Sequence, residues 1–347
     1  MAMQFVRKSN EEKRQEIEKI TKELDEQVSK LFDSETYKRY LKTMSKFHNY
    51  SFNNTLLIAM QRPDASLVAG FNAWKQNFHR NVKRGEKGIK ILAPAPVKVD
   101  REMEIIDPRT QKPVLDKDGR PKTETVKVTI PLYKVAYVYD LAQTEGDELP
   151  SLGVNELTGK VDGYKKLIKA VESVSPVPVS YEDIEGNAKG FYSLSDKKIV
   201  IQQGMSELQT LKTLIHEACH SLIHDDTGSK IEGVDDQKKN RNTKEVEAES
   251  TAFTVLSYLG MAESDENDVG DYSFGYIAGW SSGKELKELK ESMETIRKTA
   301  SYIITGIEDK LLEKTGIRDK LAEAKDKVKH NDSKSDKVKP SQIPVMA

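Results

Sequence analysis

The spacing of hydrophobic residues predicts helices along much of the chain. Residues 10–32 repeat aliphatic side chains every three or four positions, from Ile17 to Leu31. Residues 37–60 predict two helices, because the polar run NYSFNN separates two apolar stretches and can supply a cap. Residues 284–313 carry a long helical stripe, which is typical of a helix with one face in a core.

Strand-like stretches occur in the first half of the chain. Residues 89–99 predict a strand that its two prolines confine to an edge or a bulge. Residues 132–141, rich in valine and tyrosine, predict a strand that closes this half. Residues 100–128 resemble a polar hairpin, since DPRT and KDGRP are turn signals. The sequence leaves the role of this insertion open.

The polar connection AQTEGDELPSLGVNELTG marks the expected domain boundary, between residues 148 and 149. Beyond it, the pattern predicts a helix, three short strands between residues 177 and 204, and then the helices that carry the motifs below. We therefore expect an α+β protein with an α+β domain over 1–148 and a mainly helical domain with a small sheet over 149–320. The polar tail, residues 321–347, is expected to be disordered.

Composition narrows the setting of the protein but not its function. The chain has 347 residues, enough for two domains with separate cores, and a formal net charge of −1. Cys219 is the one cysteine, which excludes an intramolecular disulfide and fits a reducing compartment. The chain lacks a signal-peptide pattern and any run of roughly 20 apolar residues that could span a membrane. We expect a cytoplasmic protein without a membrane partner.

One segment carries the candidate chemistry. Within LKTLIHEACHSLIHDDTG, the motif HEACH places His216 and His220 four residues apart. On a helix both imidazoles project from one face and can bind one ion, while Glu217 can reach a water on that ion. Zinc lowers the pKa of such a water to about 7, so that a carboxylate can take its proton and the hydroxide can attack a carbonyl. The motif therefore predicts a Zn²⁺-dependent hydrolase.

A third ligand is required, and it is expected from the next helix. His224 is one turn beyond His220, but three consecutive turns of a helix do not easily converge on one ion, so we expect it to pack or hydrogen-bond instead. In TKEVEAESTAFTVLSYLG, Glu245 and Glu249 share a face with small residues. We expect one of them to bind the ion and the other to orient a ligand histidine. The order of preference for the third metal ligand is Glu245, then Glu249, then Glu247. Glu247 is expected to face solvent.

Charge is concentrated in one part of the chain. Residues 38–98 hold eight lysines and four arginines against two acidic residues, a net charge of +10, and they interleave these cations with aromatic and amide side chains. Cations follow a phosphate backbone, and aromatic rings stack on unpaired bases, which favours single-stranded over duplex DNA. The residues expected to contact nucleic acid are Asn53, Asn54, Trp74, Arg80, Lys83, Arg84, Lys87 and Lys90.

These motifs resemble the ArdC antirestriction family. The N-terminal likeness rests on YSFNNTLLIAMQRPDASLVAGFNAWKQNFHRNVKRGEKGIKILAPAP and VAYVYDLAQTEGDELP, and the C-terminal likeness on HEACH and EVEAESTAF. The second half is also distantly similar to the ImmA/IrrE group of zinc metallopeptidases. The resemblance implies a non-specific single-stranded-DNA-binding domain joined to a gluzincin-like metallopeptidase domain, which protects incoming plasmid or transposon DNA. It also implies His216, His220 and Glu245 as metal ligands and Glu217 as the catalytic acid/base.

Three functions stay open at this point. The protein can be a peptidase held on single-stranded DNA that cuts an unknown protein substrate, or a DNA-protecting module whose zinc site is structural or inactive. It can also be an ImmA-like protease that acts on a DNA-bound regulator. An intact Glu217 favours the first, because a structural site gains nothing from a general base. The basic segment argues against the third as a complete account.

Overall fold

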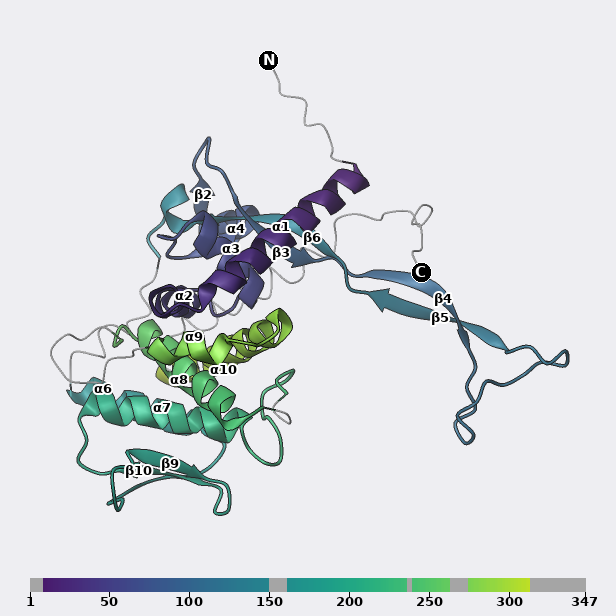
Figure 1. Cartoon of the computed structure of the whole chain (residues 1–347). Helices are drawn as coiled ribbons and strands as arrows, with labels where there is room; N and C mark the ends of the chain where they lie inside the picture. The colour runs from purple at the N-terminus through teal and green to yellow at the C-terminus, as the bar shows by residue number, and fades with distance from the viewer. Residues whose placement is uncertain (1–8, 150–160, 236–238, 263–273, 313–347) are drawn as a thin grey trace. The chain divides into compact units, whose positions relative to one another are not determined.

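The computed structural model describes residues 9–149, 161–235, 239–262 and 274–312 (Figure 1). The chain divides into two compact units, Met1–Glu23 with Lys90–Tyr137 and Leu24–Ile89 with Val138–Ala347. The architecture is mixed α+β, as expected. The tail over 321–347, expected to be disordered, lies outside the described residues. Within the part that is described, every helix is too short or too polar to cross a lipid bilayer.

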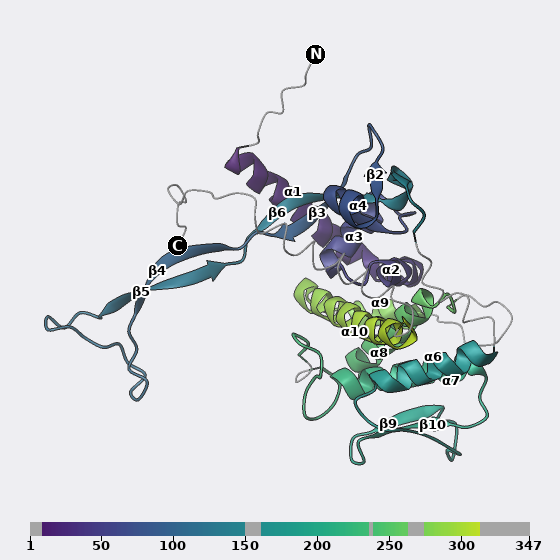
Figure 2. The same ribbon diagram turned by 180° about the vertical axis from the view of Figure 1, so that it is seen from behind.

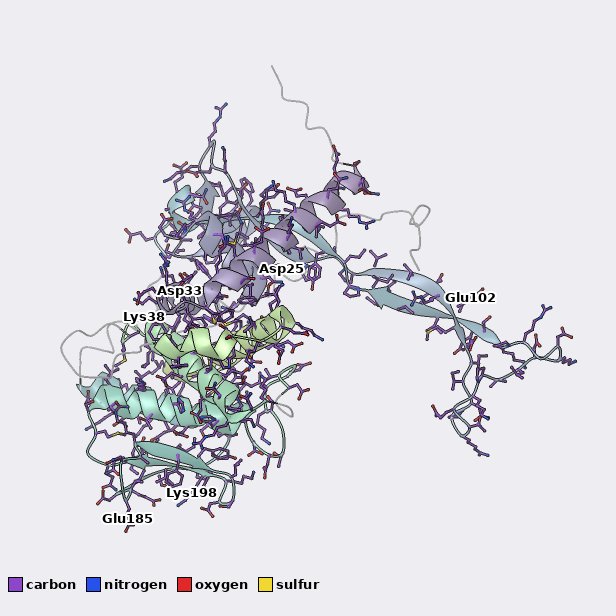
Figure 3. All side chains as sticks on the ribbon, in the orientation of Figure 1. Asp25, Asp33, Lys38, Glu102, Glu185 and Lys198 are labelled. Atoms are coloured by element: carbon purple, nitrogen blue, oxygen red, sulfur yellow. The ribbon has the colours of Figure 1, made fainter. Side chains whose placement is uncertain are left out.

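The smaller unit is built around a long antiparallel ribbon. Strand β4 (Val97–Glu104) pairs with β5 (Thr123–Ile130) in a continuous register from Val97↔Ile130 to Glu104↔Thr123. Glu102 lies on this ribbon (Figure 3). At its far end Asp107 and Asp116 accept backbone N–H groups in two tight turns. The expected hairpin over 100–128 is therefore confirmed.

Three further elements lie mostly in this smaller unit or at its border. They are α1 (Asn10–Leu31), β3 (Ile89–Pro94) and β6 (Tyr133–Asp140). The middle strand of the sheet β1-β6-β3 is β6, and β1 (Val68–Gly70) pairs antiparallel with it. The predicted strand over 89–99 is two strands, β3 and β4, separated by Ala95 and Pro96.

The N-terminal part of the larger unit consists of short elements around buried aromatic rings. They are α2 (Ser34–Lys46), α3 (Phe52–Gln61), β1, α4 (Phe71–Asn77), β2 (Arg80–Val82), the 3₁₀ turn η1 (Leu141–Gln143) and β7 (Thr144–Gly146). Asp33 caps α2 by accepting the N–H of Thr36 (Figure 3). Strands β2 and β7 pair antiparallel.

The C-terminal part of the larger unit is a helical layer on a small sheet. It contains α6 (Val161–Val174), β8 (Val179–Glu182), β9 (Gly190–Ser193), β10 (Lys198–Gln202), α7 (Glu207–Ile223), α8 (Arg241–Tyr258), η2 (Phe274–Tyr276), α9 (Ile277–Ser281) and α10 (Leu286–Leu312). In the sheet, β10 is parallel to β8 and antiparallel to β9. The sheet lies on one side of α7, and α8 and α10 lie on the other (Figures 1 and 2).

Helix α2 packs against α8 within the same unit. The fully buried Tyr37 of α2 hydrogen-bonds Ser250 of α8 at 2.8 Å, and Glu294 of α10 accepts the N–H of Phe52 at 2.9 Å. Packing therefore does not follow the boundary expected at residue 148. The functional division drawn there stays a prediction, and residues 150–160 beside it are outside the described part of the chain.

Candidate metal centre

Helix α7 holds the HEACH motif in a fixed position. Ser206 caps its start by accepting the N–H of Gln209, and its apolar residues fill the space between the sheet and α8. Strand β9 approaches α7 closely at Gly190, where an added Cβ would lie 2.7 Å from the methyl carbon of Thr213. The absence of a side chain at Gly190 therefore lets β9 lie directly beside the motif helix.

Three donor atoms converge on one point between α7 and α8. The Nε2 atoms of His216 and His220 are 3.1 Å apart, and the Glu245 Oε2 atom lies 3.4 Å from the first and 3.7 Å from the second. In a tetrahedral zinc site with ligands at about 2.0–2.1 Å, donor atoms are about 3.3–3.4 Å apart. The His216, His220 and Glu245 donors therefore fit a divalent ion. The structure brings together the three residues ranked first from the sequence.

Glu249 lies behind His216, one turn along α8 from Glu245. Its Oε2 atom is 3.4 Å from His216 Nδ1, and its Oε1 atom is 3.1 Å from Lys212 Nζ. A carboxylate in this position orients an imidazole and fixes which nitrogen carries the proton. The arrangement agrees with the orienting role expected for Glu249.

The acidic groups hold a proton on the metal-free histidine. Burial by itself lowers the pKa of His216, but the hydrogen bonds that His216 donates to Glu245 and Glu249 outweigh it and raise that pKa to about 9. The same bonds from His216 and His220 hold the pKa of Glu245 well below its usual range. Two carboxylates therefore hold one proton on His216 before any cation enters.

Glu217 differs from the three donors because it is buried beside them. Glu217 is only 8% exposed. Burial raises the pKa of its carboxyl group, although the neighbouring histidines act in the opposite direction. The backbone N–H of Tyr192 in β9 hydrogen-bonds the carboxylate. A carboxyl group with a raised pKa is suited to accept and return a proton near neutral pH.

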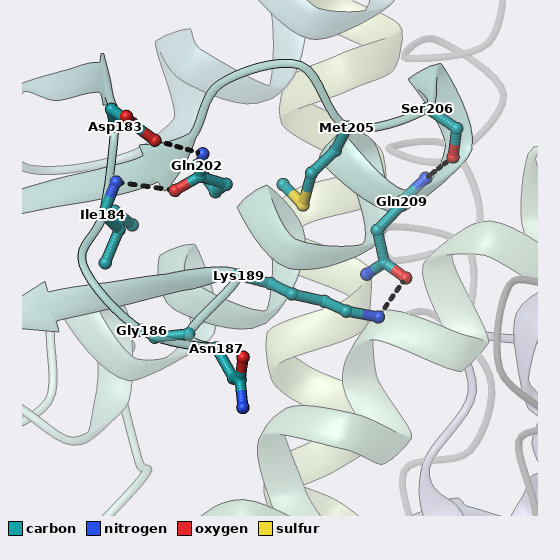
Figure 4. A pocket seen from close by; sticks show the side chains of 10 residues that line it. Asp183, Ile184, Gly186, Asn187, Lys189, Gln202, Met205, Ser206 and Gln209 are labelled. Atoms are coloured by element: carbon teal, nitrogen blue, oxygen red, sulfur yellow. Dashed lines mark hydrogen bonds between the residues drawn. The ribbon is translucent and has the colours of Figure 1, made fainter.

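Open space adjoins the cluster on its β9 side. A cavity of about 220 Å³ is bordered by His216, Glu217, Gly190 and Lys212. A second cavity of about 470 Å³ lies at the start of α7 (Figure 4). Lys189 and Gln209 line both, and Lys189 Nζ donates to Gln209 Oε1 at 2.9 Å (Figure 4). The two cavities therefore adjoin along one side of the motif helix.

One expectation about α8 is wrong. Glu247, expected to face solvent, has no exposed surface and contacts His224 and Lys239. The physical reason is that α7, α10 and α2 all pack on α8, so the side opposite Glu245 is interior. His224 is itself buried and hydrogen-bonds His220, in agreement with the expected hydrogen-bonding role.

Several residues expected to contact nucleic acid have structural partners. Trp74 is fully buried and its Nε1 donates to the Tyr139 carbonyl at 2.8 Å, which leaves no ring face for a base. Arg80 joins β2 to β7 through Thr144 and Gly146. Trp74 therefore packs inside the fold and offers no surface to a DNA strand, whereas the guanidinium of Arg80 is partly exposed and engaged in hydrogen bonds to β7.

The two asparagines are partly or fully buried, and Lys90 is ion-paired. Asn54 is buried, and the Oδ1 atom of Asn53 is buried without a hydrogen bond. Lys90 Nζ lies 2.7 Å from a carboxylate oxygen of Glu16. The residues that stay exposed are Lys83, Arg84 and Lys87, in the turn between β2 and β3. Lys83 Nζ also donates to the carbonyl of Ala142.

The candidate set from the sequence left out an exposed aromatic residue. Phe71, at the start of α4, is 54% exposed, and its ring lies 6.1 Å from that of Tyr139 between centroids. A large aromatic side chain exposed to this extent has a free face for stacking. Sequence alone does not separate Phe71 from Trp74, because both belong to one short segment rich in aromatic residues.

Comparison with known proteins finds a family model that matches the first part of the chain. Residues 10–139 match the family described as the N-terminal domain of anti-restriction factor ArdC. An uncharacterized protein of Bacillus anthracis is 26% identical over 358 residues, which cover 92% of this chain and 56% of the relative. The chain thus spans about half the length of that relative.

Two crystal structures are also similar to the chain. Both are of the antirestriction ArdC protein from the R388 plasmid, one metal-free and one Mn(II)-bound. Each is 18% identical, covers 76% of this chain and 84% of the other, and has a TM-score of 0.39.

Proposed function

From the match of residues 10–139 to the family described as the N-terminal domain of anti-restriction factor ArdC, we propose that this protein is an antirestriction factor of a mobile element. We propose further that it binds single-stranded DNA and carries a zinc-dependent peptidase site. The observation that supports the peptidase site most directly is the convergence of three donor atoms, 3.1 to 3.7 Å apart, beside the buried Glu217.

The residues of this site divide the chemistry among them. His216, His220 and Glu245 would hold the ion, which when bound acts as a Lewis acid that polarises a carbonyl and acidifies water. Glu217 takes a proton from the attacking water and returns it to the leaving amine. Among the described strands β9 pairs with β10 alone, so its other edge can bind an extended peptide by strand addition.

The substitution Glu217→Gln tests the peptidase. The amide keeps the volume of the side chain but cannot accept the proton, so we expect unchanged metal and DNA affinity and a loss of proteolysis by about 10²–10⁴-fold. Mass spectrometry of cells that express either form identifies proteins cleaved by the wild type alone. If no protein is cleaved differentially, although both forms bind zinc, the site is not a peptidase.

Exposed groups near β2 favour single-stranded DNA as a second ligand. Phe71 presents a ring, and Arg84 and Lys87 present cations that pair with no carboxylate among the described residues. Stacking on an aromatic side chain stabilises binding by about 1–3 kcal/mol per base. Each phosphate contact steepens the decrease of log affinity with log salt concentration by about 0.7 for a single strand.

Oligonucleotide titrations of the full chain measure both effects. We expect Phe71→Ala to weaken binding without changing the salt slope, and Arg84→Gln to reduce the slope. Lys165→Gln, on the exposed side of α6, is the matched control. Equal affinity for single-stranded and duplex oligonucleotides at one salt concentration contradicts the single-strand preference.

Protection of incoming DNA in cells separates cutting from binding. If Glu217→Gln still protects plasmid DNA from restriction, peptidase activity is not the cause of protection. In that outcome the alternative holds, in which the protein protects by binding and the metal site is structural. The converse result, loss of protection with DNA binding intact, favours the enzyme.

A further inference from the structure

A buried row of polar side chains extends from the metal cluster toward the interior. The Nδ1 atom of His220 lies 2.9 Å from Nδ1 of His224, and the Nε2 atom of His224 lies 3.2 Å from Oε2 of Glu247. Lys239 Nζ is 2.9 Å from Oε1 of Glu247 and donates to Oε2 at 3.0 Å. The side chains of His224 and Glu247 are 2% and 0% exposed, so solvent does not substitute for these contacts.

The local structure explains how the row forms. His220 and His224 are four residues apart, and His224 is the residue at which α7 ends, with its N–H on the His220 carbonyl. Glu247 projects from α8 on the side away from Glu245, and Lys239 precedes the cap of α8. Lys239 Nζ also donates to Thr295 of α10 at 3.1 Å. Three helices thus fix the four side chains.

The donors and acceptors in this row can be assigned in only one way that leaves Nε2 of His220 open to a metal. A carboxylate accepts only, so Nε2 of His224 must donate to Glu247. Neutral imidazole carries one proton, which leaves Nδ1 of His224 as an acceptor. Nδ1 of His220 must then donate to it, and Nε2 of His220 is left with a lone pair. The positive charge of Lys239 balances Glu247, so the imidazole need only supply a hydrogen bond.

We propose that Glu247 acts through His224 to hold His220 in the tautomer and orientation that present Nε2 to the metal ion. His224 and Glu247 are positioning residues in this proposal, and it rests on the metal site proposed above. His216 has the simpler equivalent, in which Glu249 contacts Nδ1 directly and Lys212 contacts Glu249. Each ligand histidine is therefore backed by a glutamate paired with a lysine, and the row behind His220 has one extra imidazole inserted.

The test uses the full chain with ¹⁵N-labelled histidine and Zn²⁺ as the probe. His224→Phe keeps a ring in the same space and removes both nitrogens, whereas His224→Gln restores one acceptor and one donor. Glu294→Gln is the matched control, because it removes a carboxylate that accepts the N–H of Phe52 and takes no part in this row. Zinc affinity is measured by chelator competition, and histidine tautomers by long-range ¹⁵N–¹H spectra of the metal-free protein.

We expect the wild-type spectra to place the proton of His220 on Nδ1 and that of His224 on Nε2. Zinc affinity should fall by about 10–100-fold in His224→Phe, as for other outer partners of ligand histidines, and most of it should return in His224→Gln. Glu294→Gln should lower thermal stability and leave zinc affinity unchanged. A purely structural role for His224 would lower stability without changing the tautomer of His220.

Two results would overturn the proposal. One is a folded His224→Phe protein that binds zinc as tightly as the wild type, and the other is a wild-type spectrum with the proton of His220 on Nε2. If His224→Phe does not fold, the spectra and the His224→Gln affinity decide. If the wild type binds no zinc, the proposed metal site is wrong, while the spectra of the metal-free protein still test the row itself.

Discussion

Metal affinity should depend on pH through the proton that His216 holds in the metal-free protein. Glu245 and Glu249 raise the pKa of this imidazole to about 9 against the effect of burial. A metal ion can bind His216 only after that proton leaves, so protons and metal compete for the same nitrogen. Affinity should therefore rise with pH and level off near pH 9.

The magnitude follows from the distance between the working pH and this pKa. At pH 7 about one molecule in a hundred has His216 deprotonated, so apparent affinity is about 100-fold below its plateau, with a tenfold change per pH unit. Binding at pH 7 should also release about one proton from His216. The same proton stabilises the metal-free fold fully below pH 6.5, the ordinary pKa of the group, and this contribution is lost as pH rises through about 9.

Chelator competition between about pH 6.5 and 10 measures the affinity, and calorimetry in two buffers with different ionisation enthalpies measures the released proton. Glu249→Gln is the informative variant, because it removes one of the two acceptors and should shift the levelling-off to lower pH. An affinity that does not change with pH, or binding without proton release, would falsify the electrostatic argument. A plateau at unchanged pH in Glu249→Gln would assign the effect to Glu245 alone.

Three further predictions concern the packing around the site. Gly190→Ala should destabilise the protein by about 1–3 kcal/mol, since the new methyl group overlaps Thr213, and chemical denaturation measures this. Trp74→Phe should cost about 1 kcal/mol through the lost bond to Tyr139 and leave DNA affinity unchanged; weaker DNA binding by a stably folded variant would contradict the structural role. Burial raises the pKa of the Asp225 carboxyl, but bonds from its neighbours lower it well below its usual range. That stabilisation is present above pH 3.8 and is lost as pH falls below it, so Asp225→Asn should be less stable at pH 7 and show a flatter loss of thermal stability between about pH 4 and 2.

Short-range pattern was sufficient to predict most elements and the centre of the metal site. His216 and His220 are four residues apart, and helix geometry alone brings their side chains to one face. Glu245 and Glu249 were ranked first on their helix because they lie one turn apart among small residues. These inferences needed only the period of an α-helix and the chemistry of the ligands.

The errors have a common origin in long-range packing. Glu247 was expected to face solvent from its helical position, and Trp74 was expected to contact nucleic acid from its residue type. Whether a side chain is exposed, however, depends on which elements pack against it. Helix α8 is covered by α2, α7 and α10, so Glu247 is interior. Its sequence, EVEAESTAFTV, has small and apolar residues on every side, and this was the available signal.

The sequence by itself determined the helices, the hairpin insertion, the basic segment and the candidate metal ligands on each helix, since each depends on local periodicity or composition. Only the tertiary structure decided which partners stand behind the ligands. His220 and Glu247 are 27 positions apart, and their connection through His224 exists because α7 ends against α8 at the point where Lys239 enters. No spacing rule contains that information, because it depends on where two helices meet.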